Sequence, residues 1–251
     1  MNDWIIGMLV FLYGLAIGSF LNVVIYRMPL GQSFVVGRSF CPSCQHQLSA
    51  RDLVPLFSYL AQFGKCRYCK APISARYPLV ELLNGLLFFL VYKKWGLTID
   101  ALFDAILLSA ILVAALIDYD THKIPNRLNA FVALLALVRL SINFSRFSAV
   151  LPGILLMIAF FALVLGLSFL LKRTLFGMGD IKLLLALSLY FDYSSLLVLL
   201  AIAFSVAGLM ALMMFSVGEK SLHSRLPMGP YFAIATVLTV LYGDLLILFI
   251  K

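Results

Sequence analysis

Residues 150–171, VLPGILLMIAFFALVLGLSFLL, contain no charged side chain. About 20 mostly apolar residues suffice for a helix to cross a bilayer, so this stretch predicts a membrane-spanning helix. The whole chain has the same character, because 63% of its 251 residues are hydrophobic, 12% are charged, and its mean hydropathy is +1.06. A soluble chain is about half apolar and about a quarter charged. The composition excludes soluble, disordered, collagen-like and small disulfide-rich proteins, and it predicts an all-α polytopic membrane protein.

Eight apolar segments are predicted to be transmembrane helices. They are residues 4–24, 79–95, 97–117, 128–142, 150–171, 181–190, 194–217 and 230–250. The sixth is only about three helical turns long, so it is either a short helix or a re-entrant one shielded by its neighbours. The first segment is not preceded by basic residues and is not followed by a small-residue cleavage site, which favours a retained helix over a signal peptide. The chain then divides into a first transmembrane helix (1–26), a polar loop (27–77) and a transmembrane core (78–251).

The distribution of basic residues predicts the orientation in the membrane. With eight spans, one side holds residues 26–77, 118–127, 172–182 and 218–229, which contain 14 of the 19 Lys and Arg residues. Basic loops stay in the cytoplasm, so this side is predicted to be cytoplasmic and both termini to lie outside. The formal net charge of +8 is explained by this bias, and we expect a lipid bilayer rather than nucleic acid as the partner.

All four cysteines lie in the first loop, as Cys41-Pro-Ser-Cys44 and Cys66-Arg-Tyr-Cys69 with 21 residues between the pairs. Two C-x2-C turns can complete a tetrahedral structural zinc site. Two disulfides are the alternative, but they need an oxidising compartment and this loop is predicted to be cytoplasmic. His46 could replace one thiolate, although four cysteines suffice without it.

Two aspartates lie at the ends of apolar segments. Asp118 ends one apolar run, and Asp180 in Gly177-Met-Gly179-Asp180 directly precedes another. The 61 residues between them contain two predicted spans, so both carboxylates are expected at the cytoplasmic face. Two adjacent carboxylates can share a proton, one activating water while the other protonates a scissile carbonyl. The sequence therefore predicts an aspartyl hydrolase, although either aspartate alone could merely cap a helix.

The residues around Asp180 fit the same chemistry. Gly177 and Gly179 are expected to supply backbone torsions that other residues resist, and to let a substrate backbone approach closely. Lys182 is placed to act on the charge of Asp180 or to face lipid headgroups. We expect all three residues to contribute to substrate binding.

Six motifs occur in the order found in the type IV prepilin peptidases, membrane aspartyl proteases of the GxGD class, which this chain resembles nearly end to end. They are Gly18-Ser-Phe-Leu-Asn22-Val-Val-Ile-Tyr-Arg27-Met-Pro29, the two cysteine pairs, Ile73-Ser-Ala-Arg76-Tyr-Pro78-Leu-Val-Glu81, Asp118 with Ile124-Pro125-Asn126, Gly177-Met-Gly-Asp180-Ile-Lys182, and Leu226-Pro227-Met-Gly229-Pro230-Tyr.

The resemblance implies an enzyme of the bacterial inner membrane. Such enzymes remove the basic leader of type IV prepilins and pseudopilins after a glycine, on the cytoplasmic side. It implies that Asp118 and Asp180 are catalytic and Asp120 is not. Many members also methylate the new N-terminus with S-adenosylmethionine, an activity that involves the first loop and here implicates Gly64. Glu81 is a candidate contact for the basic leader.

Three other functions remain open from the sequence. Another GxGD protease is disfavoured by the four-cysteine loop. An ion-coupled transporter would place its acids near the bilayer midplane, whereas these lie at helix ends. A non-enzymatic scaffold would use the cysteine loop as a docking module and would not depend on either aspartate.

Overall fold

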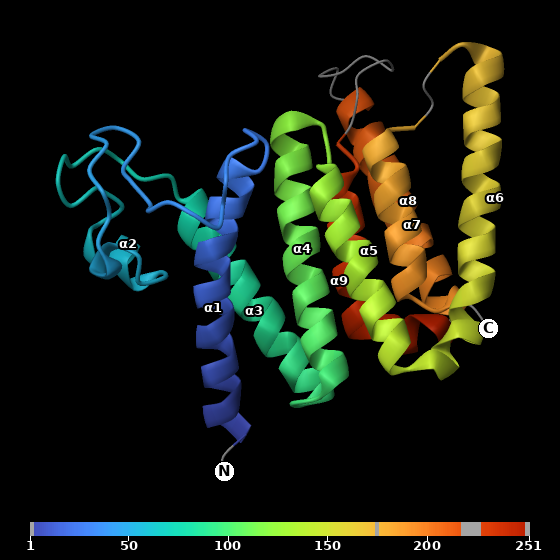
Figure 1. The fold of residues 1–251 in the computed structure, drawn as a ribbon, viewed down its shortest axis with the longest axis horizontal. Coiled ribbons are helices and arrows are strands. Elements are labelled where there is room, and N and C mark those ends of the chain that lie inside the picture. The colour runs from blue at the N-terminus through green and yellow to red at the C-terminus, as the bar shows by residue number, and fades with distance from the viewer. Residues whose placement is uncertain (1–2, 174–175, 217–226, 249–251) are drawn as a thin grey trace. The chain divides into compact units, whose positions relative to one another are not determined.

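The computed structural model describes residues 3–173, 176–216 and 227–248. Within these ranges the chain is helical, and β-structure is limited to two isolated antiparallel bridges. The long helices are α1 (Asp3–Arg27), α3 (Arg76–Trp95), α4 (Ile99–Thr121), α5 (Asn126–Ile142), α6 (Phe147–Leu171), α7 (Met178–Tyr190), α8 (Tyr193–Ser216) and α9 (Gly229–Leu248) (Figure 1). Short helices are η1 (Ala50–Asp52), α2 (Phe57–Ala61) and η2 (Phe144–Arg146). The all-α prediction is confirmed.

Each predicted span coincides with one of the eight long helices. In the described ranges, α1, α4, η2 with α6, α8 and α9 are long and apolar enough to cross a membrane. Helices α3, α5 and α7 have 20, 17 and 13 residues and do not meet the criteria of both length and apolar composition. That these three helices cross the membrane therefore stays a prediction. Most of the predicted loop 218–229, Leu226 of the last motif and the end of the last span lie outside the described residues.

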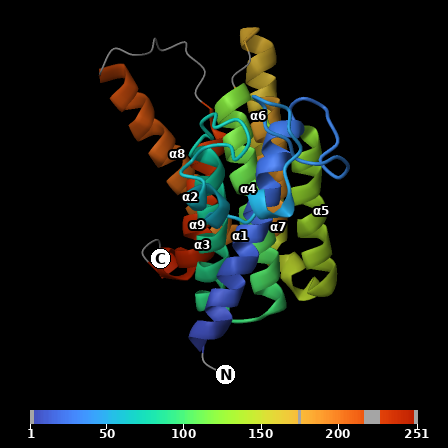
Figure 2. The same cartoon turned by 90° about the vertical axis from the view of Figure 1, so that its left-hand side faces the viewer.

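The chain forms two compact units, residues 1–109 and 110–251. In the first unit, α1 packs along α3 (Figures 1 and 2). Glycines allow the two backbones to approach, because a Cβ at Gly18 would lie 2.7 Å from the Cα of Glu81. Asn84 donates from its side-chain amide to the carbonyl of Gly14 at 2.7 Å. Small residues and a buried amide thus join these helices, as is common between membrane helices.

Helix α7 lies at the centre of the second unit. It packs against α5, α6 and α8, and α8 also packs against α9. The side chains of Leu183, Leu184 and Leu187 are fully buried. This explains why a 13-residue helix is stable here, since its neighbours supply the apolar contacts that a short helix lacks on its own. Residues 181–190 are helical and enclosed by neighbouring helices, and whether this helix crosses the membrane or is re-entrant stays a prediction.

Arg27, the last residue of α1, organises the start of the polar loop. Its guanidinium donates to the backbone carbonyls of Ser33, Val36, Gly37 and Arg38 at 3.0 to 3.4 Å. A guanidinium can serve several acceptors at once because it has five N–H donors. The loop is therefore anchored to α1 before the first cysteine pair.

Candidate functional site

The two cysteine pairs form two turns of the same construction. In each turn the N–H of the first cysteine, Cys41 or Cys66, donates to the carbonyl five residues later, and its carbonyl accepts from the N–H four residues later. The residue that supplies this last N–H, Gln45 or Lys70, has a positive φ of 58° or 62°. The repeated geometry turns both thiols of each pair toward one point.

The four sulfur atoms lie within 4.8 Å of one another, and Cys41 Sγ is 3.9 Å from Cys69 Sγ. All four cysteines are free, so the disulfide alternative is wrong for this structure. Four sulfur atoms bound tetrahedrally at about 2.3 Å from one metal ion would be about 3.8 Å apart. The cluster therefore has the size of a single-ion site.

The thiols of the cluster differ in acidity. The backbone N–H groups of Cys44 and Ser43 lower the pKa of the Cys41 thiol to about 6, which favours the thiolate that a metal requires. The bond from the Ala71 N–H lowers the pKa of the Cys69 thiol, but burial and hydrogen bonds with the other three cysteines outweigh it and raise this pKa to about 11. His46 does not join the cluster, because its ring stacks on Tyr68 with 3.6 Å between the ring centroids.

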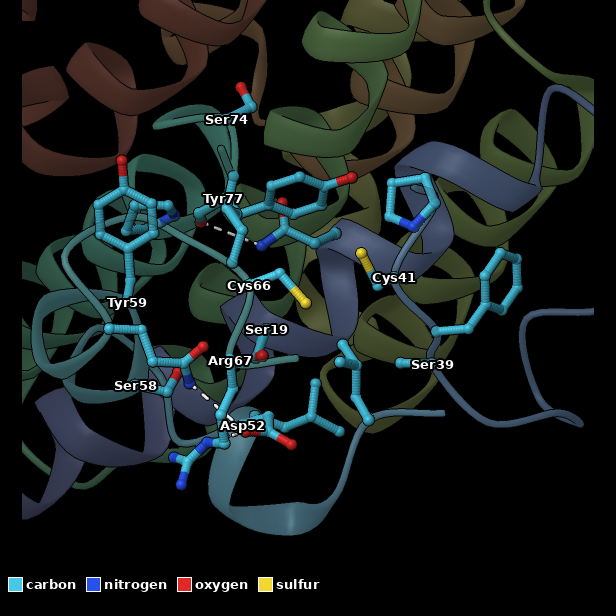
Figure 3. Close-up of a pocket in the computed structure, with 18 of the residues that line it drawn as sticks. Ser19, Ser39, Cys41, Asp52, Ser58, Tyr59, Cys66, Arg67, Ser74 and Tyr77 are labelled. Carbon is cyan, nitrogen blue, oxygen red and sulfur yellow. Dashed lines mark hydrogen bonds and ion pairs between the residues drawn. The ribbon is translucent and has the colours of Figure 1, made fainter. Parts of the chain in front are cut away.

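Asp52 connects η1 to the second cysteine turn. Its side chain is 3% exposed and accepts from the Ser49 hydroxyl at 2.7 Å and from the Tyr68 hydroxyl at 3.1 Å. It also accepts from Arg67 Nε at 2.8 Å, and Figure 3 shows Asp52 and Arg67 side by side. Burial raises the pKa of Asp52, but the bonds from Ser49 and Tyr68 and the charge of Arg67 outweigh it and hold the pKa below its ordinary value. These contacts make Asp52 a structural residue of the loop.

Asp118 lies in the last turn of α4 and is 4% exposed. Its Oδ2 accepts a hydrogen bond of 2.8 Å from the backbone N–H of Gly229, the first residue of α9. A Cβ at position 229 would lie only 2.8 Å from the Cβ of Asp118. Glycine is therefore the residue that lets the start of α9 reach this carboxylate.

Asp180 lies in the first turn of α7 and interacts electrostatically with Asp118. Two contacts bring their segments together. The Asn129 side-chain amide donates to the carbonyl of Gly179 at 3.1 Å, and a Cβ at Gly179 would lie 3.2 Å from Ile124. The structure thus brings the two predicted aspartates together inside the second unit.

The glycines beside Asp180 are not required for the backbone torsions that were expected of them. Gly177 has φ −69°, and Gly179 is not among the residues with positive φ, so neither uses a torsion reserved for glycine. A Cβ at Gly177 would instead lie 2.6 Å from Asp180 Oδ2. The torsion argument is wrong, and space is the reason: the glycines leave room for the Asp180 carboxylate and for Ile124.

The other residues predicted for binding lie at two places. Lys182 donates from Nζ to the side chain of Asn126 at 2.8 Å, on the exposed side of the second unit. Glu81 and Gly64 belong to the first unit, where Glu81 is 8% exposed and Gly64 has φ 67°.

The sequence did not identify Asn129 or Gly229 as contributors to the site. Asn129 is 4% exposed and its Oδ1 has no hydrogen-bond partner. A polar residue within a predicted span was the available signal for Asn129. For Gly229 the signal was only its position in the last motif.

Comparison with known proteins identifies the family. Residues 12–95 match the bacterial Peptidase A24 N-terminal domain and residues 105–212 match the type IV leader peptidase family. A prepilin leader peptidase/N-methyltransferase of Aeromonas hydrophila is 34% identical over 96% of this chain and 92% of its own length. The chain belongs to the type IV leader peptidase family.

Other relatives carry the same name. A prepilin leader peptidase/N-methyltransferase of Bacillus subtilis is 30% identical over 96% of both chains. One of Pseudomonas aeruginosa is 33% identical over 93% of this chain and 89% of its own length. No solved structure matches the chain. The family resemblance inferred from the motifs is confirmed.

Proposed function

We propose that this protein is a prepilin leader peptidase and N-methyltransferase of the bacterial inner membrane. It cleaves the basic leader of type IV prepilins and pseudopilins after a glycine and then methylates the new N-terminus. The observation that carries the peptidase function is the Asp118–Asp180 pair, whose two motifs are joined by the contact of Gly179 with Ile124 and by the hydrogen bond from Lys182 to Asn126. The apolar helices and the names of the relatives support the membrane location and the substrate class.

The two carboxylates are suited to general acid–base hydrolysis. With like charges close together, the pair holds one proton between them. The ionised member takes a proton from water, and the protonated member donates to the carbonyl oxygen of the scissile bond. The Gly229 N–H bonds one oxygen of Asp118 and so fixes the orientation of that carboxylate before the substrate arrives.

The substrate would meet the pair at the ends of α4 and α7. We propose that the apolar helix of the prepilin stays in the bilayer while its leader junction reaches the aspartates from the cytoplasm. Gly177, Gly179 and Lys182 border Asp180 and would contact the substrate backbone or the leader. The exposed backbone at Gly177 supports this placement.

The four cysteines are proposed to bind one structural zinc ion. All-thiolate sites of this spacing are typical of zinc, and four protein ligands leave no open position for catalysis. The zinc would fix the fold of the polar loop 27–77, while residues 78–251 form the peptidase core.

S-adenosylmethionine is proposed as the methyl donor. The names of the relatives support this function. The resemblance of the segment before Cys66 to the family motif implicates Gly64. The positive φ of Gly64 and its contact with Tyr59, 3.0 Å from where a Cβ would lie, give this glycine a defined structural requirement.

Substitution of the aspartates tests the peptidase function. Membranes containing the wild-type protein, Asp118→Asn or Asp180→Asn would be incubated with a prepilin, and the product N-terminus read by mass spectrometry. Each variant should abolish leader removal, because an asparagine amide can neither accept a proton from water nor donate one to the scissile carbonyl as a carboxyl group does. Asp120→Asn is the matched control, since Asp120 is exposed at the end of the same helix, and it should retain most activity. Cleavage by both dyad variants would refute the assignment.

A further inference from the structure

The first unit contains a pocket of about 400 Å³ that the peptidase chemistry does not use. Its walls come from α1, from the cysteine loop and from the start of α3, and Figure 3 shows Tyr59, Tyr77 and Cys66 around it. Ligand pockets for small molecules are typically of 300–1,000 Å³, apolar in most of their lining with a few polar groups. This pocket is large enough for one cofactor-sized molecule.

Glu81 is the unbalanced charge of this pocket. Its carboxylate is buried, and Oε2 accepts the backbone N–H of Leu56 at 2.8 Å. The Ser19 hydroxyl also donates to this carboxylate, and in the described part of the chain no Lys, Arg or His forms an ion pair with Glu81. A buried carboxylate without a cation is costly, so this position favours a ligand that carries one.

The other charged groups that line the pocket already have partners. Asp52 is paired with Arg67, and Arg27 donates to four backbone carbonyls of the loop. Neither Arg67 nor Arg27 therefore neutralises the charge of Glu81. A ligand cation would therefore be directed to Glu81 rather than to Asp52.

The aromatic wall is connected to Gly64. Tyr59 lines the pocket, and its hydroxyl lies 3.0 Å from where a Cβ on Gly64 would be. The Gly64 N–H also donates to the carbonyl of Tyr59 at 2.9 Å. A side chain at position 64 would displace Tyr59, so the glycine assigned to methylation by its motif keeps the wall of this pocket in place.

We infer that this pocket is the methyl-transfer site and that Glu81 binds a protonated α-amino group within it. The inference rests on the proposed methyltransferase function. Two molecules of that reaction carry such a group: the amino-acid part of S-adenosylmethionine and the new N-terminus of the cleaved pilin. Tyrosine side chains that line the same pocket would cover the flat or apolar part of either ligand.

A cycle of variants and ligands tests the inference with the full-length protein in detergent. Binding of S-adenosylhomocysteine would be compared with binding of its analogue that has hydrogen in place of the amino group. A peptide with the N-terminal sequence of the mature pilin would be compared with the same peptide acetylated at its N-terminus. Each pair would be measured by calorimetry for the wild type, for Glu81→Gln and for Asp244→Asn, an exposed acid outside the pocket.

The wild type should prefer the ligand with the free amino group by about 10- to 100-fold in one of the two pairs, as expected for a charged hydrogen bond. Glu81→Gln should reduce that preference to about 1, while Asp244→Asn keeps it. The ligand pair whose preference is lost in Glu81→Gln shows whether the cofactor or the pilin N-terminus binds at Glu81. Because the preference compares two ligands on one variant, a general loss of stability does not produce this result.

The outcomes separate the inference from the proposed function. If Glu81→Gln keeps both preferences while the wild type methylates cleaved pilin, the assignment of Glu81 is overturned and the methyltransferase function stands. If the wild type transfers no methyl group to any cleaved pilin supplied, the proposed methylation fails and the inference with it. Leader cleavage in the same samples reports the peptidase function independently.

Discussion

Replacing Gly229 with alanine would move the Asp118 carboxylate without altering any ionisable group. The new Cβ would lie 2.8 Å from the Cβ of Asp118, 3.0 Å from its Oδ2 and 3.2 Å from the Cα of Ala115. Carbon atoms in contact prefer separations of about 3.5–4.0 Å. Because Ala115 is part of the α4 backbone, the added methyl group cannot be accommodated by a flexible side chain alone.

The expected size of the effect follows from these distances. Relieving the contact requires a relative shift of roughly 0.7–1 Å between the start of α9 and the end of α4. Overpacking of this kind costs about 1–3 kcal/mol of stability. A displacement of about 1 Å in a catalytic group costs about 100-fold in rate. We therefore expect Gly229→Ala to lower the rate of leader cleavage by about 10- to 100-fold.

The assay is the initial rate of prepilin cleavage in membranes, with thermal unfolding measured in detergent. Gly166→Ala and Gly208→Ala are matched controls, because a Cβ at either position in α6 or α8 meets nothing within 4 Å of this chain. Both controls should keep the wild-type rate and gain slightly in helix stability. A folded Gly229→Ala protein that cleaves at the wild-type rate would refute the proposed role of this contact.

Three further predictions concern the loop and the second unit. Metal analysis of the purified protein should find about one zinc ion per chain, and Cys66→Ser should lower this content; a metal-free wild-type protein with four titratable thiols would contradict the zinc site. Asn129→Leu should reduce the rate of cleavage about 10-fold while the fold persists, because the lost hydrogen bond to the carbonyl of Gly179 is worth about 1–1.5 kcal/mol. An unchanged turnover number would show that this bond does not position Asp180. Asp52→Asn should make the loop more sensitive to proteolysis at pH 7, by about 1–2 kcal/mol of local stability. Because the pKa of Asp52 is lowered by folding, this difference should be present above about pH 4 and shrink as the pH falls through the folded pKa; a difference that grows on acidification would contradict the assignment.

The features that the sequence predicted correctly are those encoded locally. An apolar run of about 20 residues predicts a membrane helix without reference to other segments. The spacing of the cysteines predicts two metal-binding turns in the same way, and the structure assembles all four thiols. Span assignment was weakest for α3, α5 and α7, which are shorter or more polar than the others. A short helix such as α7 is stabilised by neighbours that no local pattern reveals.

The features that the sequence did not predict depend on contacts between distant segments. The bond from Gly229 to Asp118 joins residues 111 positions apart, and that from Asn129 to Gly179 joins residues 50 apart. The requirement for glycine at position 177 was also misassigned. A side chain there is excluded by the nearby Asp180 carboxylate, and the backbone torsion of Gly177 is one that other residues adopt. Identifying such residues requires knowledge of which helices are adjacent.

By itself the sequence determined the class of protein, the positions of the long helices, the four clustered cysteines and the two neighbouring aspartates, because composition, spacing and the chemistry of each residue type are local properties. Only the tertiary structure decided how Asp118 is oriented, which glycines are needed for space, and that Glu81 lies in a pocket without an ion-pair partner among the residues that the structure describes. Those properties arise from packing, in which helices far apart in the chain determine the volume and the hydrogen-bond partners available to each side chain.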